Sequence, residues 1–173
     1  MNAPLFISKA NQQDIPELVA LVNSAYRGES SKIGWTTEAD LLDGVRIVET
    51  TLLDQMLTPG QYFLKAVDGH GTIIGCVSLL EKETAIYLGM LTVNPTIQSK
   101  GIGRTLLDAS TDFAKDLGKQ YIEMTVITKR AELIEWYERK GYVKTGEFRP
   151  FPNDPKFGIQ KEPLEFLVLK KTL

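Results

Sequence analysis

An apolar run followed by a glycine-rich turn constrains the fold of this chain more than any other stretch. Residues 84–93, TAIYLGMLTV, have the apolar and β-branched content of a buried strand. The turn NPTIQSKGIG follows at 94–103, and residues 101–117 then show apolar residues at helical spacing. The order strand, turn, helix leaves two readings of the turn open. It either binds a phosphate group at a helix N-terminus or simply connects two elements.

The two glycines of this turn, Gly101 and Gly103, are compatible with an anion site but do not by themselves distinguish it from a connecting loop. The first amides of a helix have no intrahelical acceptor, and the helix dipole favours a negative charge beside them. A glycine also removes the Cβ that would keep a ligand away from the backbone, and Lys100 and Arg104 add positive charge. A Walker A sequence is absent, and a dinucleotide fingerprint would require Gly or Ala where Leu106 stands.

Strands and helices alternate along the rest of the chain. Strands are predicted at residues 4–10, 61–67, 72–80, 84–93, 119–128, 142–151 and 164–171. Helices are predicted at residues 11–26, 36–57, 101–117 and 129–141, and Gly44 is a potential break within the second of them. Asn11 and Asp14 form a capping-box pattern, and Asp68-Gly69 indicates a hairpin. The order β-α-α-β-β-β-α-β-α-β-β predicts an α/β (α+β) fold, with residues 1–173 as a single domain.

Composition excludes several classes of function. Hydrophobic residues make up 43% and charged residues 24%, as in ordinary globular proteins, and the net charge of -2 gives no overall attraction to nucleic acid or anionic membranes. Cys76 is the only cysteine and His70 the only histidine, so we expect no disulfide within the chain, no metal site and no Ser-His-Asp triad. The sequence lacks both a secretory signal pattern and an apolar run of about 18 residues, so we expect a cytoplasmic protein with no membrane partner.

The glycine turn resembles the acetyl-CoA signature of the GCN5-related N-acetyltransferase (GNAT) superfamily. That signature, Q/R-x-x-G-x-G/A, stands here as Gln98, Gly101 and Gly103, between a strand with an Asn-Pro turn and a helix. A second family block, a helix that carries a tyrosine and ends in Gly and an aromatic residue, is matched by RAELIEWYERKGY at 130–142. The resemblance covers nearly the whole chain. It implies the GNAT fold, a mixed and largely antiparallel central sheet of about seven strands with helices on both faces.

The resemblance implies acetyl-CoA as the cofactor and CoA as a product. The pyrophosphate would lie on the amides of the turn, and the pantetheine would pair with the preceding strand. Carried over by motif, the cofactor-binding residues are Leu91, Thr92, Val93, Gln98, Ser99, Lys100, Gly101, Ile102, Gly103 and Arg104. Arg130 stands where many members have Asn, seven residues before the tyrosine of the second block, and it either contacts the cofactor or is solvated.

Acetyl transfer from a thioester to an amine requires a deprotonated amine and a proton for the leaving thiolate. The resemblance implies Tyr137 as the general acid, because a phenol with a pKa of about 10 can protonate a thiolate. The alternative is that Tyr137 is a core aromatic residue. Tyr87 stands where some members have a catalytic Glu, so the general base is unassigned. Cys76 is interpreted as a small buried hydrophobe rather than as an acetyl-carrying nucleophile.

In this superfamily the first two helices and their connection help to form the acceptor pocket. The candidate acceptor-binding residues are Arg27, Glu29, Trp35, Thr36 and Glu38. The alternative is that Trp35 serves packing and that Thr37 and Asp40 serve as helix caps. The resemblance therefore implies an acetyl-CoA-dependent N-acetyltransferase that acts on a primary amine of a small molecule by direct attack in a ternary complex. The alternative is a non-catalytic acyl-CoA-binding sensor on the same fold. No nucleic acid partner is expected, and a homodimer is one expected assembly because dimers are common in the superfamily.

Overall fold

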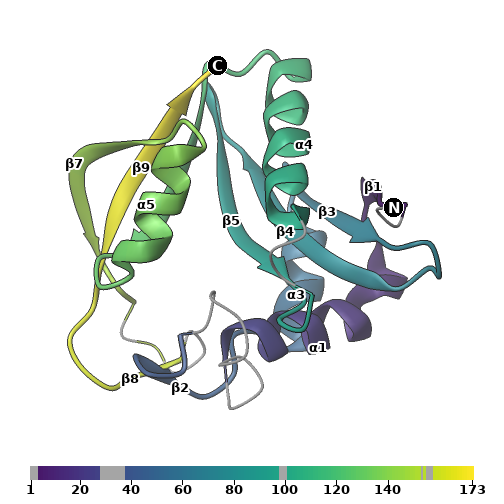
Figure 1. Cartoon of the computed structure of the whole chain (residues 1–173), viewed down its shortest axis with the longest axis horizontal. Coiled ribbons are helices and arrows are strands. Elements are labelled where there is room, and N and C mark those ends of the chain that lie inside the picture. The colour runs from purple at the N-terminus through teal and green to yellow at the C-terminus, as the bar shows by residue number, and fades with distance from the viewer. Residues whose placement is uncertain (1–3, 28–37, 98–100, 153, 155–157) are drawn as a thin grey trace.

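A seven-stranded, largely antiparallel sheet forms the centre of the molecule (Figure 1). The computed structural model describes residues 4–27, 38–97, 101–152, 154 and 158–173. The strands of the sheet, in spatial order, are β1 (Phe6–Lys9), β3 (Gln61–Val67), β4 (Ile73–Glu81), β5 (Ala85–Val93), β6 (Tyr121–Ile127), β9 (Glu165–Thr172) and β7 (Val143–Pro150). Within the described residues, β5 and β6 form the one parallel pair of this sheet. The prediction of a mixed sheet of about seven strands is confirmed.

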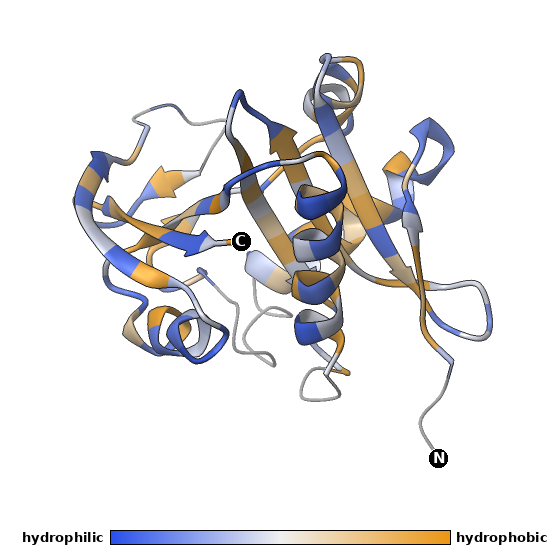
Figure 2. Ribbon diagram, turned by 90° about the horizontal axis from the view of Figure 1, so that it is seen from above, coloured by the Kyte–Doolittle hydropathy of each residue, from blue (hydrophilic) through white to orange (hydrophobic). Residues whose placement is uncertain are grey.

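Helices cover both faces of the sheet. One core cluster joins α4 (Ile102–Asp116) and α5 (Ala131–Arg139) to β3–β6 through residues such as Leu64 and Val77. The other joins α1 (Ile15–Tyr26) and α3 (Glu49–Met56) to the opposite face through residues such as Phe63 and Cys76. Figure 2 shows hydrophobic residues concentrated on the central strands and hydrophilic residues on outward-facing helix turns. Among the described helices, none has the length and apolar content that a membrane span requires.

The start of α1 is set by local side-chain bonds. Asn11 precedes a short 3-10 turn, η1 (Gln12–Asp14), and its Oδ1 accepts a hydrogen bond from the Gln13 amide at 2.9 Å. The Asn11 amide donates to the Asp14 carboxylate at 2.9 Å, which completes the predicted capping box. Asp14 also forms an ion pair with Lys65 at 2.9 Å, so the same carboxylate joins the beginning of α1 to β3.

The predicted helix over residues 36–57 is wrong in its first part. Among the described residues of that range, only α3 is helical, and β2 (Leu42–Asp43) pairs with β8 (Ile159–Gln160) in a separate two-stranded sheet. Gly44 follows β2 with a φ of +88°, which is incompatible with a continuous right-handed helix. Leu42 packs with Ile127 and Leu164 in a small apolar cluster, so tertiary burial overrides the helical spacing of the sequence.

The sheet opens between β5 and β6. The two strands pair only where Ala85–Tyr87 face Tyr121–Glu123, although both strands continue beyond these residues. Further along β5, Met90 and Leu91 together face Val77 of β4, because the register shifts between Cys76 and Ser78. This bulge bends β5 away from β6. The separated ends of the two strands, visible in the centre of Figure 1, frame the candidate site.

Candidate active site

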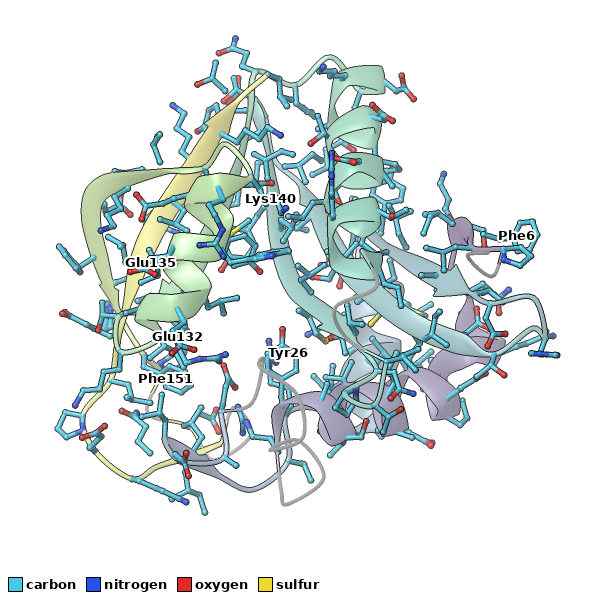
Figure 3. All side chains as sticks on the ribbon, in the orientation of Figure 1. Phe6, Tyr26, Glu132, Glu135, Lys140 and Phe151 are labelled. Atoms are coloured by element: carbon cyan, nitrogen blue, oxygen red, sulfur yellow. The ribbon has the colours of Figure 1, made fainter. Side chains whose placement is uncertain are left out.

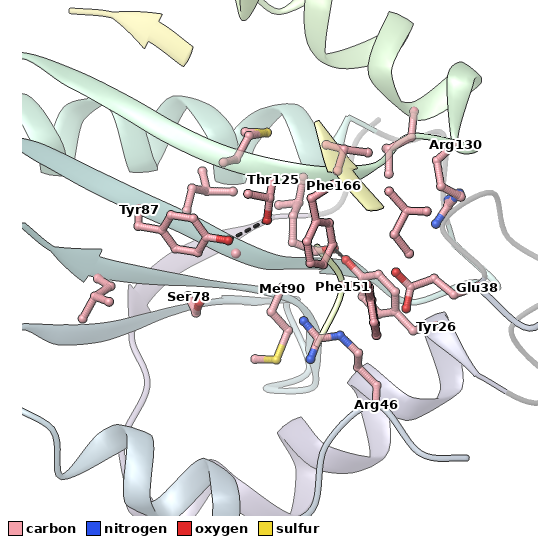
Figure 4. A pocket seen from close by; sticks show the side chains of 18 of the residues that line it. Tyr26, Glu38, Arg46, Ser78, Tyr87, Met90, Thr125, Arg130, Phe151 and Phe166 are labelled. Atoms are coloured by element: carbon pink, nitrogen blue, oxygen red, sulfur yellow. Dashed lines mark hydrogen bonds between the residues drawn. The ribbon is translucent and has the colours of Figure 1, made fainter. Parts of the chain in front are cut away.

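A cavity of about 380 Å³ lies in the opening between β5 and β6 (Figure 4). Residues 87–91 of β5 and 124–127 of β6 form two of its walls. The C-terminal end of α1, the beginning of α5 and Phe151 complete the enclosure. Polar groups such as the Tyr87 hydroxyl and apolar groups such as Leu88 both contribute to the lining. The size and mixed character are typical of a small-molecule site.

The β5 wall is held in a strained conformation. Met90 has a φ of +51°, which costs about 1–3 kcal/mol for a residue with a side chain. The Tyr26 hydroxyl donates a hydrogen bond to the Leu91 carbonyl, next to this residue. Figure 3 shows Tyr26 pointing from the end of α1 into the opening. Burial, assisted by the charge of Glu38, raises the pKa of Tyr26 to about 12, so its hydroxyl remains a donor at neutral pH.

The glycine turn leads into α4 as the sequence predicts, but its two glycines have different surroundings. Gly101 is the N-cap of α4 with a φ of +78°, and no described atom lies within 4 Å of the position that a Cβ would take. A Cβ on Gly103 would instead lie 3.4 Å from the Trp136 ring and 3.6 Å from Val93. Gly101 therefore leaves the helix terminus open, whereas Gly103 allows α5 to pack closely against α4.

The N-terminus of α4 fits a phosphate group. Thr105 is the first residue of the helix whose amide bonds back along it, to the Gly101 carbonyl at 3.0 Å, so the preceding amides have no intrahelical acceptor. Gly101 carries no side chain that could cap them. The exposed Arg104 adds positive charge, with Asp108 at 4.0 Å as its neighbour. Gln98, Ser99 and Lys100 lie outside the described residues.

Tyr137 of α5 lines the cavity and is also part of the core. Its ring packs edge to face against Trp136 and Tyr142, with centroids 5.1 and 5.8 Å apart. Burial raises the pKa of Tyr137 well above its ordinary value of 10, and the neighbouring phenols Tyr26 and Tyr142 add to the rise. The phenol is therefore protonated at neutral pH and borders the cavity. Both predicted roles, core aromatic residue and proton donor, are compatible with this position.

The family model of the acetyltransferase (GNAT) family matches residues 20–142, more than half of the chain. The chain belongs to the GNAT family. The matched segment includes both strands of the opening, the glycine turn and α5. GNAT acetyltransferases use acetyl-CoA, and the open helix terminus at Gly101 is suited to the pyrophosphate of such a cofactor.

Individual GNAT relatives are distant. The chain is 28% identical to the IAA acetyltransferase of Azospirillum brasilense over 96 residues, which are 54% of this chain and 63% of that protein. It spans less than two thirds of the length of the curated relatives it matches. The fold is similar to that of yncA, a putative acetyltransferase from Salmonella typhimurium determined with its cofactor acetyl-CoA, with a TM-score of 0.72 and 19% identity over 99% of this chain and 95% of that chain. The ribosomal-protein-S18-alanine N-acetyltransferase of Escherichia coli gives a TM-score of 0.72 and 15% identity over 98% and 94% of the two chains.

The acceptor residues predicted from the GNAT resemblance are only partly described. Glu29, Trp35 and Thr36 lie outside the described residues. Arg27 and Glu38 both line the cavity, but they bind each other: the Arg27 Nη2 and Nε donate to Glu38 Oε1 at 2.9 and 3.2 Å. Arg27 also donates to the Val45 carbonyl at 3.3 Å and packs against Gly158, where a Cβ would collide with its guanidinium. Arg27 thus joins four segments of the chain.

The GNAT cavity contains further polar residues that are not among the predicted cofactor-binding or acceptor-binding residues. Arg46 lies with its guanidinium 5.7 Å from the centre of the Tyr26 ring. The Tyr87 hydroxyl and Thr125 Oγ1 are 2.6 Å apart and bridge the opening between β5 and β6. Arg46 stands within the stretch predicted as helix, so its position could not be derived from periodicity. Tyr26 stands at the end of the predicted helix over residues 11–26, and a helical pattern does not show that its hydroxyl reaches β5.

Cys76 takes no part in the cavity. Its side chain is fully buried beneath α1, and burial raises the pKa of its thiol to about 12. A thiol in this position is not ionised at neutral pH and has no access to solvent. The interpretation of Cys76 as a small buried hydrophobe is confirmed.

Proposed function

We propose that this chain forms one acetyltransferase domain over residues 1–173 and transfers an acetyl group from acetyl-CoA to a primary amine of a small molecule. The observation that carries the proposal is the cavity in the β5–β6 opening, which a protonated, buried phenol borders. Its volume of about 380 Å³ suits a small acceptor. Membership of the GNAT family supports the reaction type. Proteins of similar structure are named for protein acceptors in some cases and for small-molecule acceptors in others. The preference for a small-molecule acceptor therefore rests on the cavity and not on the similar proteins.

The residues proposed to hold the cofactor belong to two elements. When bound, acetyl-CoA supplies the acetyl group as a thioester. The amides of Ile102, Gly103 and Arg104, together with Gly101 and residues 98–100, would bind the pyrophosphate. The β5 residues Leu91, Thr92 and Val93 would bind the pantetheine, since β5 has no β6 partner beyond Tyr87. Arg130, at the beginning of α5, borders the cavity and would contact the same cofactor.

Direct attack in a ternary complex accounts for the proton and bond changes. The amine nitrogen forms the new N–C bond, the C–S bond breaks, and the amine loses one proton to water. Tyr137 donates a proton to the departing sulfur and regains one from solvent. A route through an acetylated cysteine is disfavoured, because Cys76 is fully buried outside the cavity.

Acetyl-CoA should raise the Tm of the wild-type protein by about 5–10 °C at a hundredfold excess over Kd.

Gly101→Asp should weaken acetyl-CoA binding about 10- to 100-fold relative to Gly101→Asn, because a carboxylate some 5 Å from a phosphate costs about 1–3 kcal/mol. The two side chains have the same shape and both tolerate a positive φ, so they differ mainly in charge. Calorimetric titration of both variants measures the difference. Equal affinities would contradict a phosphate site at Gly101.

A screen of small amines tests catalysis itself, with the release of the CoA thiol as the measured signal. Thiol release that requires both acetyl-CoA and an amine supports the enzyme. Acetyl-CoA binding without thiol release from a broad panel would instead favour the non-catalytic sensor.

A further inference from the structure

We infer that the acceptor is an amino-acid-like molecule whose carboxylate binds Arg46 while its amine faces the acetyl group. This inference rests on the proposed function and extends it to the chemical class of the substrate. It starts from the charges in the cavity. The described lining residues include the guanidinium groups of Arg27, Arg46 and Arg130 but only one carboxylate, that of Glu38, an excess of two positive charges. The whole chain, by contrast, has a net charge of -2.

The carboxylate of Glu38 is committed to Arg27. Their side chains are 13% and 4% exposed, and two hydrogen bonds join them. Arg46, by comparison, forms no ion pair with a carboxylate among the described residues. The positive charge of Arg46 acts on the Tyr26 phenol, where it partly offsets the rise in the pKa of that group. Arg46 is therefore the described cavity residue best suited to a ligand carboxylate.

Arg46 is held in place by a dedicated contact. The Asn23 side chain of α1 accepts hydrogen bonds from the Arg46 and Ile47 amides at 2.7 and 3.1 Å. The same side chain donates to the Ile47 carbonyl at 2.9 Å. The side-chain carboxamide of Asn23 thus both accepts from and donates to the backbone of Arg46 and Ile47, as the backbone of a neighbouring strand would. Arg46 and Met90, the strained residue of β5, both line the cavity (Figure 4).

The other walls suit the rest of such a molecule. Phe151 and Phe166 pack together with ring centroids 5.1 Å apart and offer an apolar surface, and both line the cavity. A guanidinium binds a carboxylate through two parallel hydrogen bonds, which orients the ligand as well as attracting it. The positive excess disfavours polyamines. It also lowers the pKa of a bound ammonium group, which helps to produce the neutral amine where Tyr87 replaces a catalytic Glu.

The test compares amino acids with their decarboxylated amines in the thiol-release assay. Suitable pairs are phenylalanine with phenethylamine, leucine with isopentylamine and methionine with 3-(methylthio)propylamine, and spermidine represents the polyamines. At least one amino acid should exceed its amine in kcat/KM by about 10- to 100-fold, as expected for a charge-assisted hydrogen-bonded pair. Arg46→Gln should remove that advantage, mainly through KM. It should leave the acetyl-CoA-induced rise in Tm unchanged, which assigns the loss to acceptor binding.

Arg139→Gln is the matched control, because it removes the same charge from an exposed position of α5 outside the cavity. It should preserve the preference for the amino acid. Equal kcat/KM values within every pair, a preference for spermidine, or an equal loss of preference in both variants would overturn the inference alone. No thiol release from any amine would overturn the proposed function and the inference with it.

Discussion

Tyr137→Phe should lower kcat with a small amine by about 100- to 10,000-fold, the usual contribution of a general acid. The Tyr137 phenol borders the cavity, and burial holds its pKa well above 10. A proton donor with such a pKa stays protonated throughout the working pH range, so a loss of activity from its ionisation should occur only above pH 10. Steady-state kinetics and the acetyl-CoA-induced rise in Tm would separate turnover from binding. The rise in Tm should persist in the variant.

Tyr142→Phe is the matched control for this substitution. Tyr142 is buried in the same aromatic cluster but does not line the cavity, and its hydroxyl has no hydrogen-bond partner among the described residues. Removal of that hydroxyl should leave kcat unchanged, and it should maintain or slightly increase the free energy of unfolding. An unchanged kcat in Tyr137→Phe would remove Tyr137 as the acid. An equal loss of kcat in both variants would attribute the effect to packing.

The features that the sequence predicts well are those set by local chemistry. The capping box at Asn11 depends on two side chains within four residues, and the structure forms it. The central strands alternate or run apolar over seven to nine residues, and β3 begins and ends where the pattern predicts. The glycine turn is local too. The helix predicted from residue 101 begins at Ile102, whereas the contact of Gly103 with Trp136 depends on how two distant helices pack.

The features that the sequence does not predict depend on long-range pairing. Leu42 lies within the stretch predicted as a helix, but its burial against Ile127 and Leu164 is decided by residues far along the chain. Arg27 and Glu38 both line the cavity, but only the fold reveals that they form an ion pair with each other. Arg46 becomes a candidate for substrate binding only once the fold brings it to the cavity, where its backbone is bonded to Asn23. The sequence shows that these residues are charged, but only the tertiary structure shows which groups they contact.

Glu38→Gln should lower the free energy of unfolding by about 3 kcal/mol, because it removes the carboxylate that pairs with the buried Arg27 guanidinium. Arg27 is buried, and its ion pair with Glu38 joins the end of α1 to the segment before β2. For a chain of this length the change corresponds to a fall in Tm of about 6–12 °C. Denaturant unfolding and thermal melting both measure it.

Glu135→Gln is the control for Glu38→Gln, since Glu135 is exposed on α5 and its loss should change the free energy of unfolding by less than about 0.5 kcal/mol (Figure 3).

Arg27→Met should also be strongly destabilising, because it leaves the Glu38 carboxylate, only 13% exposed, without its cation. The double variant Arg27→Met/Glu38→Gln should lose less stability than the sum of the two single variants, because neither charge is then left alone. Strict additivity of the two substitutions would contradict the pairing. Since the pair borders the cavity, the same double variant would also show whether the wall that it supports is required for turnover of the small amine.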